Sequence, residues 1–207
     1  MSTFRSTTFG MISGRHGNAV AAEMRNGVNV LKVFNAPFNP KSVKQVAQRT
    51  KFKFAIQSLA CLRDLFKTTF RTQGGANYGI SLAFKNCVAG ISPDYSIDYT
   101  KMILSQGSIN GSTNNSAEKS TGTSVMVTWV SSVKQSALAS DNVNLVFFHN
   151  EFQEVVLKEN CAKRTAGTLT VELPNEWAEG SVHCWIYFSL EDGSRNSTSN
   201  YIIQVQL

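Results

Sequence analysis

Residues 41–71 carry a helical repeat that limits the fold more than any other part of the chain. At about 100° per residue, their apolar side chains fall on two neighbouring stripes that together cover roughly half of a helix circumference. The first stripe consists of Phe52, Ala55, Leu59, Leu62, Phe66 and Phe70, and the second of Val43, Ala47, Phe54, Cys61 and Leu65. The spacing predicts one long amphipathic helix that starts after Ser42, stops before Gly74-Gly75 and is buried more deeply toward residue 70.

The remaining side of this helix carries a basic stripe. It spans an arc of roughly 80° and consists of Arg49, Lys53, Arg63, Lys67 and Arg71. Cations at this spacing suit an acidic protein surface or nucleic-acid phosphates. We therefore take these five residues as candidate partner-binding or nucleic-acid-binding residues. A solvated helix face explains the same pattern without a ligand, and no helix-turn-helix, zinc-finger or RNA-recognition signature accompanies it.

The two halves of the chain differ in charge. Residues 1–104 hold 14 Lys and Arg against 4 Asp and Glu, a net +10, whereas residues 105–207 hold 6 against 10, a net −4. A basic half attracts nucleic acid, acidic lipid or an acidic protein surface. The acidic half is itself such a surface, in the same chain or in the next subunit, so both readings remain open.

The first half contains two further elements. Asn18 to Phe34 reads as a β-hairpin around Asn26-Gly27, a strong short turn signal. The spacing of Tyr78 and Leu82 predicts a second helix over residues 77–88. Residues 1–94 are thus expected to form a basic unit made of a hairpin and helices.

From Ser124 onward, short strands follow one another at close intervals. They are expected at Ser124–Val130, Val143–His149, Val155–Lys158, Thr168–Leu173, Val182–Leu190 and Tyr201–Leu207. With Trp129 on an early strand, this rhythm is typical of an immunoglobulin- or fibronectin-like antiparallel β-sandwich. Tyr95–Ile109 would supply a missing strand, and the polar stretch 110–123 reads as a linker-like loop. The expected fold class is therefore α+β, with a β-sandwich domain over residues 95–207.

The sequence contains no recognisable catalytic constellation. His16, His149 and His183 are not arranged as metal ligands, and neither a nucleophile elbow nor a phosphate loop is present. Strand alternation sends His183 and Cys184 to opposite faces, and we expect His183 to face outward. We predict a protein that is not an enzyme, with no catalytic residue, metal site or cofactor.

The cysteines and the first residues bear on the cellular compartment. Cys61, Cys87, Cys161 and Cys184 lack C-x-x-C spacing and are expected to be buried free thiols, with a Cys161–Cys184 cross-link as the alternative. The start of the chain has no apolar core of a signal peptide, and nowhere is there an apolar run of membrane-spanning length. We expect synthesis in the cytoplasm, no signal peptide and no membrane partner.

Several segments along the chain carry a resemblance to known sequences. They are Ser13-Gly14-Arg15-His16-Gly17-Asn18-Ala19-Val20, Asn39-Pro40-Lys41-Ser42 with Gln45, Gln48-Arg49 and Phe52, Ile97-Asp98-Tyr99 with Ser105 and Gly107, then Asp141, Arg164, Leu173-Pro174, Trp177 and Ser199-Asn200-Tyr201. Over nearly its whole length, the chain resembles a family of uncharacterised Bacteroidetes proteins of about this size. That family implies no activity. The segment from Asn39 to Phe52 is also similar to small proteins encoded among phage and prophage structural genes.

Together these observations favour a non-enzymatic structural or assembly protein. Taken with the similarity to phage and prophage structural proteins, we expect a virion or other surface-assembly component of a Bacteroidetes phage or prophage. It would act through protein–protein contacts as a homo-oligomer or larger assembly. The first alternative is a nucleic-acid-binding protein that uses the basic stripe. The second alternative is an enzyme whose site the sequence does not reveal.

Overall fold

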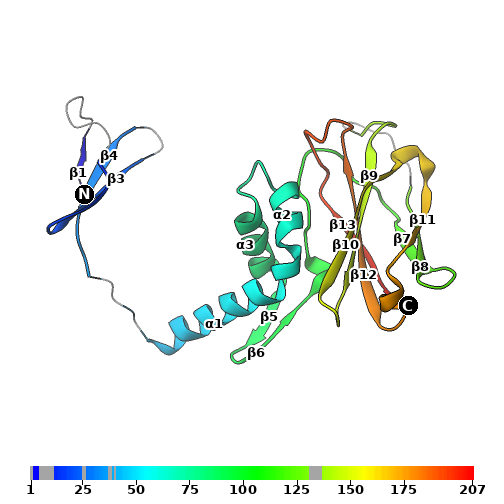
Figure 1. Cartoon of the computed structure of the whole chain (residues 1–207), viewed down its shortest axis with the longest axis horizontal. Coiled ribbons are helices and arrows are strands. Elements are labelled where there is room, and N and C mark those ends of the chain that lie inside the picture. Colours follow the sequence, from blue (N-terminus) through cyan, green and yellow to red (C-terminus); the bar gives the residue numbers. More distant parts are fainter. Residues whose placement is uncertain (1, 5–11, 25–26, 37–38, 40, 131–136) are drawn as a thin grey trace. The chain divides into compact units, whose positions relative to one another are not determined.

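The computed structural model describes residues 2–4, 12–24, 27–36, 39, 41–130 and 137–207 (Figure 1). The chain forms two compact units, Met1–Ser42 and Val43–Leu207. Helices and antiparallel sheets occupy separate stretches of the sequence, so the α+β class is confirmed. Over the described residues, no helix is both long enough and apolar enough to cross a membrane.

The first unit is a small antiparallel sheet. Its strands are β1 (Ser2–Phe4), β2 (Gly14–His16), β3 (Ala19–Glu23) and β4 (Asn29–Val33), in the order β1-β4-β3-β2. β3 and β4 are the arms of the predicted hairpin, although Asn26 of its turn lies outside the described residues. The buried apolar side chains among the described residues of this unit are Ala21 and Val30. A core of this size gives little stability by itself.

The second unit begins with helices. They are α1 (Val43–Ser58), the 3₁₀ turn η1 (Ala60–Leu62), α2 (Arg63–Thr69) and α3 (Ala76–Asn86). The prediction of a single helix over residues 41–71 is wrong, because the chain leaves α-helical geometry at Leu59, where φ is −103° and ψ is 12°. No proline or glycine causes this break. It redirects the chain so that Leu62 and Phe66 both reach a buried core, and tertiary packing overrides the helical pattern.

Burial along the predicted stripes deepens as expected toward residue 70. Leu59, Leu62, Phe66 and Phe70 are fully buried. On α1, however, Ala55 is the only buried residue, and Val43 is almost fully exposed. The helix expected over residues 77–88 is confirmed as α3.

A hairpin and a turn replace the strand expected over residues 95–109. β5 (Val88–Ile91) pairs with β6 (Asp94–Ile97), and the 3₁₀ turn η2 (Tyr99–Lys101) follows at once. The Asp98 carboxylate starts this turn, because it accepts a hydrogen bond from the backbone N–H of Thr100 at 3.1 Å. The chain then continues irregularly, with Met102 and Leu104 buried.

Two sheets complete the second unit. Their strands are β7 (Ser116–Lys119), β8 (Ser124–Thr128), β9 (Asn142–His149), β10 (Glu154–Lys163), β11 (Thr168–Glu172), β12 (Ser181–Ser189) and β13 (Asn200–Gln206). One sheet has the order β10-β9-β12-β13 and the other β11-β8-β7. All six strands expected from Ser124 onward are present. The seventh, β7, lies inside the predicted loop 110–123. The sequence does not predict it, because Ala117 is its only buried residue and the other three are exposed and polar.

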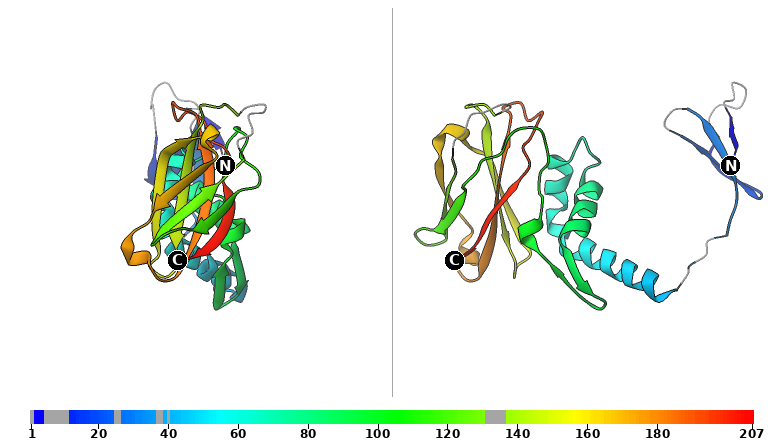
Figure 2. Two further views of the ribbon diagram at one scale, coloured as in Figure 1. Left: turned by 90° about the vertical axis from the view of Figure 1, so that its right-hand side faces the viewer. Right: turned by 180° about the vertical axis from the view of Figure 1, so that it is seen from behind.

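The sheet β10-β9-β12-β13 is covered by the three-stranded sheet on one face and by the helices on the other (Figures 1 and 2). On β9, Val143, Leu145 and Phe147 pack toward the three-stranded sheet. The alternate residues Val146 and Phe148 pack with side chains of α2 and α3. Since the helices share a core with this sheet, the compact units divide at residue 42 and not at the expected residue 94.

A buried ion pair closes one end of the three-stranded sheet. Arg164 Nε donates to Asp141 Oδ2 at 3.1 Å, and both side chains are fully buried. Arg164 also donates to the carbonyl of Asn110 at 2.7 Å, and its guanidinium lies 3.8 Å from the centre of the Phe188 ring. Asp141 Oδ2 in turn accepts the backbone N–H of Leu138. The pair thus ties three separate segments to the strand β12.

All four cysteines are free thiols. Cys161 lies on β10 and Cys184 on β12, with β9 between them. Two strand spacings amount to roughly 9.5 Å, which exceeds the Cα separation of about 7 Å that a disulfide can bridge. Burial raises the pKa of Cys87 and of Cys184 to about 12, so these thiols remain protonated at neutral pH.

Candidate functional site

The five predicted binding residues are all exposed, but they do not form one stripe. The break at Leu59 places Arg49 and Lys53 on α1 and the remaining three on or just after α2. Lys67 and Arg71 line a groove on the second unit, whereas Arg63 lines neither of the two hollows described below. The structure therefore places four of the five residues on two separate surfaces and leaves Arg63 outside both.

The first surface, here called the α1 face, is an open hollow on the outer side of α1. Its residues are Gln48, Arg49, Phe52, Lys53, Ile56 and Gln57. Phe52 is 44% exposed and Ile56 is 38% exposed, so basic side chains flank uncovered apolar ones. The helix itself is held in place, since the Tyr95 hydroxyl donates to the carbonyl of Ala47 at 3.0 Å.

The second surface, here called the polar groove, is a hollow of about 840 Å³ in the second unit. Its walls are the end of α2 with the loop after it, residues 106–108, residues 159–160 of β10 and residues 193–196. Its floor is formed by Asn144 of β9 together with Tyr187 and Ser189 of β12. These three side chains lie on the helix-facing side of the sheet, the same side as Val146 and Trp185, and Tyr187 also belongs to the core that the helices share with the sheet.

Hydrogen bonds fix the floor of the polar groove. Asn144 Nδ2 donates to Ser189 Oγ at 2.9 Å. The backbone N–H of Asn160 donates to Asn144 Oδ1, also at 2.9 Å. Asn160 has a positive φ of 50° and lies at the irregularity that interrupts the pairing of β10 with β9. The bulge thus turns the Asn160 backbone toward the floor.

Close backbone packing fixes one wall. The N–H of Ile109 donates to the carbonyl of Asn196 at 3.2 Å. A Cβ atom on Gly107 would lie 1.9 Å from that same carbonyl oxygen, so only glycine allows the two segments to approach this closely.

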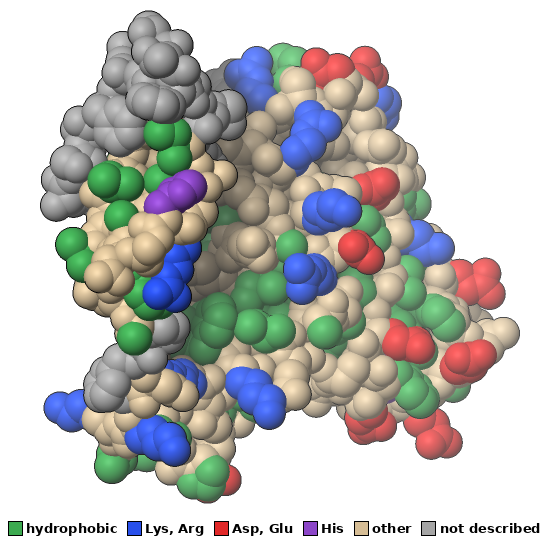
Figure 3. Space-filling view, turned by 60° about the vertical axis from the view of Figure 1, so that its left-hand side comes forward, with side chains coloured by type: hydrophobic (Ala, Val, Ile, Leu, Met, Phe, Trp, Pro, Cys, Tyr) green, Lys and Arg blue, Asp and Glu red, His purple; other side chains and the backbone are tan. Residues whose placement is uncertain are grey.

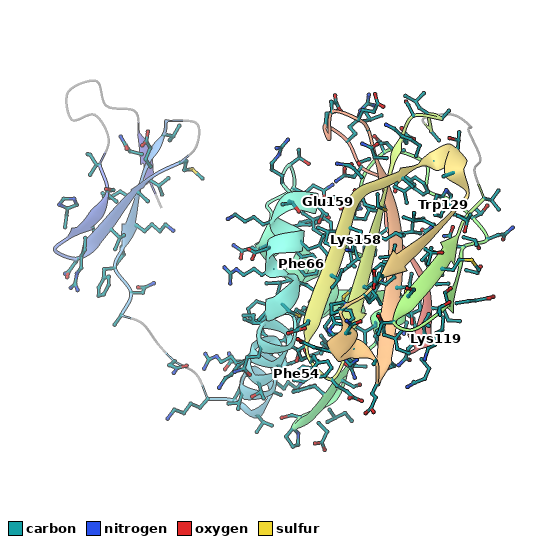
Figure 4. All side chains as sticks on the ribbon, turned by 45° about the vertical axis from the view of Figure 1, so that its right-hand side comes forward. Phe54, Phe66, Lys119, Trp129, Lys158 and Glu159 are labelled. Carbon is teal, nitrogen blue, oxygen red and sulfur yellow. The ribbon has the colours of Figure 1, made fainter. Side chains whose placement is uncertain are left out.

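Five charged side chains line the polar groove. They are Lys67, Arg71, Arg195, Asp64 and Glu159. Within the described part of the chain, none of them takes part in an ion pair. Figure 4 shows Glu159 on β10 at the end of the sheet where α2 ends. Burial and the nearby Glu159 carboxylate raise the pKa of Tyr187 well above its usual range, so its hydroxyl stays neutral.

The groove is lined by many hydrogen-bonding groups. Its described lining contains no histidine or cysteine, and no cluster of His, Cys, Asp or Glu that could hold a metal ion occurs among the described residues. Asn144, Tyr187 and Arg195 were missed by the sequence reasoning. The available signal was a polar residue at a helix-facing position inside the otherwise apolar run Val143–Phe148.

His183 is buried, so the expectation that it faces outward is wrong. It lies on the helix-facing side, opposite Cys184, and its ring contacts those of Tyr99, Phe148, Trp185 and Tyr201. Its Nδ1 is 3.0 Å from the hydroxyl of Tyr201. The turn η2 brings Tyr99 over this position, which local strand alternation could not reveal. Burial lowers the pKa of His183 below its usual 6.5.

The buried His183 makes stability depend on pH. Because its pKa is lowered on folding, the unfolded chain takes up the proton first as the pH falls below about 6.5. The stabilisation is complete above that pH and is lost below it. We expect the melting temperature to fall between pH 7.5 and pH 5.5, and His183→Gln to reduce this fall. Thermal unfolding of both proteins measures the effect, with His16→Gln on exposed β2 as the control; equal slopes for all three would contradict it.

His149 is also buried and fully engaged. Its Nε2 lies 3.0 Å from the carbonyl of Glu179, and its Nδ1 is 3.3 Å from the backbone nitrogen of Phe152. The Glu179 carbonyl accepts from Nε2 and the Phe152 N–H donates to Nδ1, so the two contacts use both ring nitrogens. These bonds tie two loops together and leave no ring nitrogen for chemistry.

Comparison with known proteins places the chain in a family. A crystal structure of a DUF3823 family protein from Bacteroides ovatus is similar at 15% identity over 58% of this chain and 68% of that chain, with a TM-score of 0.32. No curated protein matches the chain. The model of a family of unknown function, DUF6266, matches residues 11–203. The expectation of an uncharacterised family is confirmed to that extent, and the chain belongs to the family of unknown function DUF6266.

Proposed function

We propose that this protein is a non-enzymatic assembly protein whose copies join through the α1 face. The observation that carries the proposal is the uncovered apolar surface of Phe52 and Ile56 beside exposed Lys53. Apolar side chains ringed by charge are typical of protein–protein contact surfaces. On the face shown in Figure 3, hydrophobic side chains lie open to solvent near Lys and Arg side chains, while most Asp and Glu side chains lie in the right-hand half of the view.

The outer face of the three-stranded sheet is the surface that fits the α1 face. Met126 of the middle strand is 38% exposed there. Glu118 of β7 lies directly opposite Met126, and exposed Glu172 of β11 pairs with Ser124 on the same face. The sheet face thus has an apolar centre and two carboxylates. It complements the α1 face, whose apolar centre lies beside the cations Arg49 and Lys53. We therefore propose that the partner is a second copy of this chain.

Such a contact joins two different surfaces of the same chain. A heterologous contact closes into a ring if its rotation permits and otherwise continues as a filament. The net charges of +10 and −4 on the two halves favour this head-to-tail arrangement over a symmetric one. Both outcomes suit a structural protein.

Two finer proposals accompany this function. The first is that β7–β13 form an immunoglobulin-like sandwich. If β7, β8, β9, β10, β11, β12 and β13 are given the immunoglobulin letters A, B, C, C′, E, F and G, the two sheets have the orders E-B-A and C′-C-F-G. These orders match those of immunoglobulin domains and support the proposal. The second is that the assembly is a virion or surface component of a Bacteroidetes phage or prophage. It is supported by the sequence resemblances alone.

Light scattering on a sizing column tests the assembly. We expect the wild-type mass to exceed that of one chain at low salt and to fall as salt screens the charges. Lys53→Glu and Glu172→Lys should each weaken association by about tenfold or more, because each places like charges together. Combining the two reversals should restore association, because both partners then exchange sign.

Lys85→Glu provides a matched control, since Lys85 is an exposed lysine on α3 outside both hollows. It should leave the mass unchanged. A monomer at all salt and protein concentrations would refute the proposal. A mass that rises only when duplex DNA is added, and only at low salt, would instead support the nucleic-acid alternative, which the exposure of all five predicted cations favours.

A further inference from the structure

We propose that the polar groove is a binding site for a neutral saccharide. This site is separate from the α1 face and does not depend on the assembly function. The groove volume of about 840 Å³ falls within the range of roughly 300–1,000 Å³ found for ligand pockets. That space accepts a ligand larger than a single sugar ring.

The chemistry of the lining points to a ligand that is recognised through hydrogen bonds. Glycines aside, every lining side chain ends in a hydroxyl, amide, carboxylate or cationic group, and none is aliphatic. Ligand pockets are ordinarily dominated by apolar side chains with a few polar ones. A ligand that enters here meets donors and acceptors together with the apolar stems of these side chains, and this mixture suits the hydroxyl and C–H groups of a saccharide.

The hydroxyl of Tyr187 is the central unpartnered group. Tyr187 is only 4% exposed, yet it lines the groove, and its hydroxyl makes no hydrogen bond to any described residue. Because this hydroxyl is open to the groove, a ligand hydroxyl there can form a hydrogen bond with it. Asn144 and Ser189 beside it are already bonded to each other, so the floor is rigid before the ligand binds.

The two carboxylates favour a saccharide over a polyanion, although the three cations Lys67, Arg71 and Arg195 also line the groove. Asp64 and Glu159 would repel the phosphates of a nucleic acid that lay against Lys67 and Arg71. The same carboxylates can accept hydrogen bonds from sugar hydroxyls, and the cationic side chains can donate hydrogen bonds to the oxygens of those hydroxyls. Its described lining also presents no exposed aromatic ring of the kind on which single-stranded bases stack. A neutral ligand rich in hydroxyls uses both signs of charge.

A printed array of neutral oligosaccharides and polysaccharides, built on glucose, mannose, xylose and galactose, provides the probe. Calorimetry then measures the affinity of the array hits for the full-length protein. An oligothymidylate is titrated in parallel as a phosphodiester ligand. We expect at least one neutral saccharide to bind and the oligothymidylate to bind more weakly in this groove.

Three substitutions assign the site. Tyr187→Phe removes only the unpartnered hydroxyl, and Asn160→Gly removes an amide while glycine keeps the positive φ. Glu159→Gln keeps the shape of the side chain but removes its charge. Each should weaken saccharide binding by roughly threefold to tenfold, the loss of about one hydrogen bond. Asn114→Gly is the matched control, since Asn114 also has a positive φ but lies outside the groove.

Each outcome decides the proposal. Loss of affinity in the three groove variants, with Asn114→Gly unchanged and all melting temperatures retained, supports it. If no neutral saccharide binds, or if binding survives all three substitutions, the proposal is overturned. Glu159→Gln distinguishes the two kinds of ligand most clearly. In a saccharide site this substitution lowers the affinity for the saccharide, whereas in a phosphate site it raises the affinity for oligothymidylate. Such a gain would overturn the saccharide proposal in favour of a polyanionic ligand.

Discussion

Replacing Arg164 by methionine should lower the free energy of unfolding by about 3–5 kcal/mol, the effect of breaking a buried ion pair from one side. The substitution leaves the Asp141 carboxylate fully buried without its cation. It also removes the bond to the carbonyl of Asn110 and the contact with the Phe188 ring. Equilibrium unfolding in urea measures the loss.

A double-mutant cycle separates the pair from its surroundings. Asp141→Leu alone should also be strongly destabilising, but the double variant with Arg164→Met should lose much less than the sum, because no charge remains buried. Lys163→Met next door is the control, since Lys163 forms an exposed ion pair with Glu191 and such pairs contribute little. Equal losses from Lys163→Met and Arg164→Met would contradict the importance of burial.

The same pair shows what the sequence could not reveal. Asp141 and Arg164 are 23 positions apart and each reads as an ordinary polar residue next to a strand. Their burial follows from the contact between residues 137–141 and the chain at the end of β10, which no local pattern encodes. The strands themselves were predictable, since short runs of strand-forming residues between turn signals are local features, and β9 to β13 fall where such runs occur.

The candidate site shows the same division. Exposure of the five basic residues followed from helical periodicity and is confirmed. The separation of Arg49 and Lys53 on the α1 face from Lys67 and Arg71 in the polar groove did not, because it depends on the break at Leu59. No helix-breaking residue type occurs at that break. Arg195 joins Lys67 and Arg71 only because β12 and the chain after it return beside α2. Contacts between such distant segments need the tertiary structure.

Phe66→Ala should lower the free energy of unfolding by about 3–5 kcal/mol, because it empties the place of a fully buried aromatic ring. Phe66, labelled on α2 in Figure 4, belongs to the core that joins the helices to the four-stranded sheet. Its ring packs against Gly79 of α3 so closely that a Cβ atom there would lie 2.5 Å from the ring. Neither helix can move in to fill the cavity without breaking its contacts with the sheet. Urea unfolding again gives the measurement.

Phe52→Ala is the matched control, because Phe52 lies on the same predicted stripe as Phe66. A continuous helix with that stripe buried would make the two substitutions similarly costly. The structure instead leaves Phe52 44% exposed on α1, with an edge contact to Phe84 as its ring partner. Phe52→Ala should therefore cost much less stability while weakening the association proposed for the α1 face. If Phe52→Ala destabilises the fold as strongly as Phe66→Ala, then α1 is packed within its own chain, and the exposed apolar surface on which the assembly proposal rests does not exist in solution.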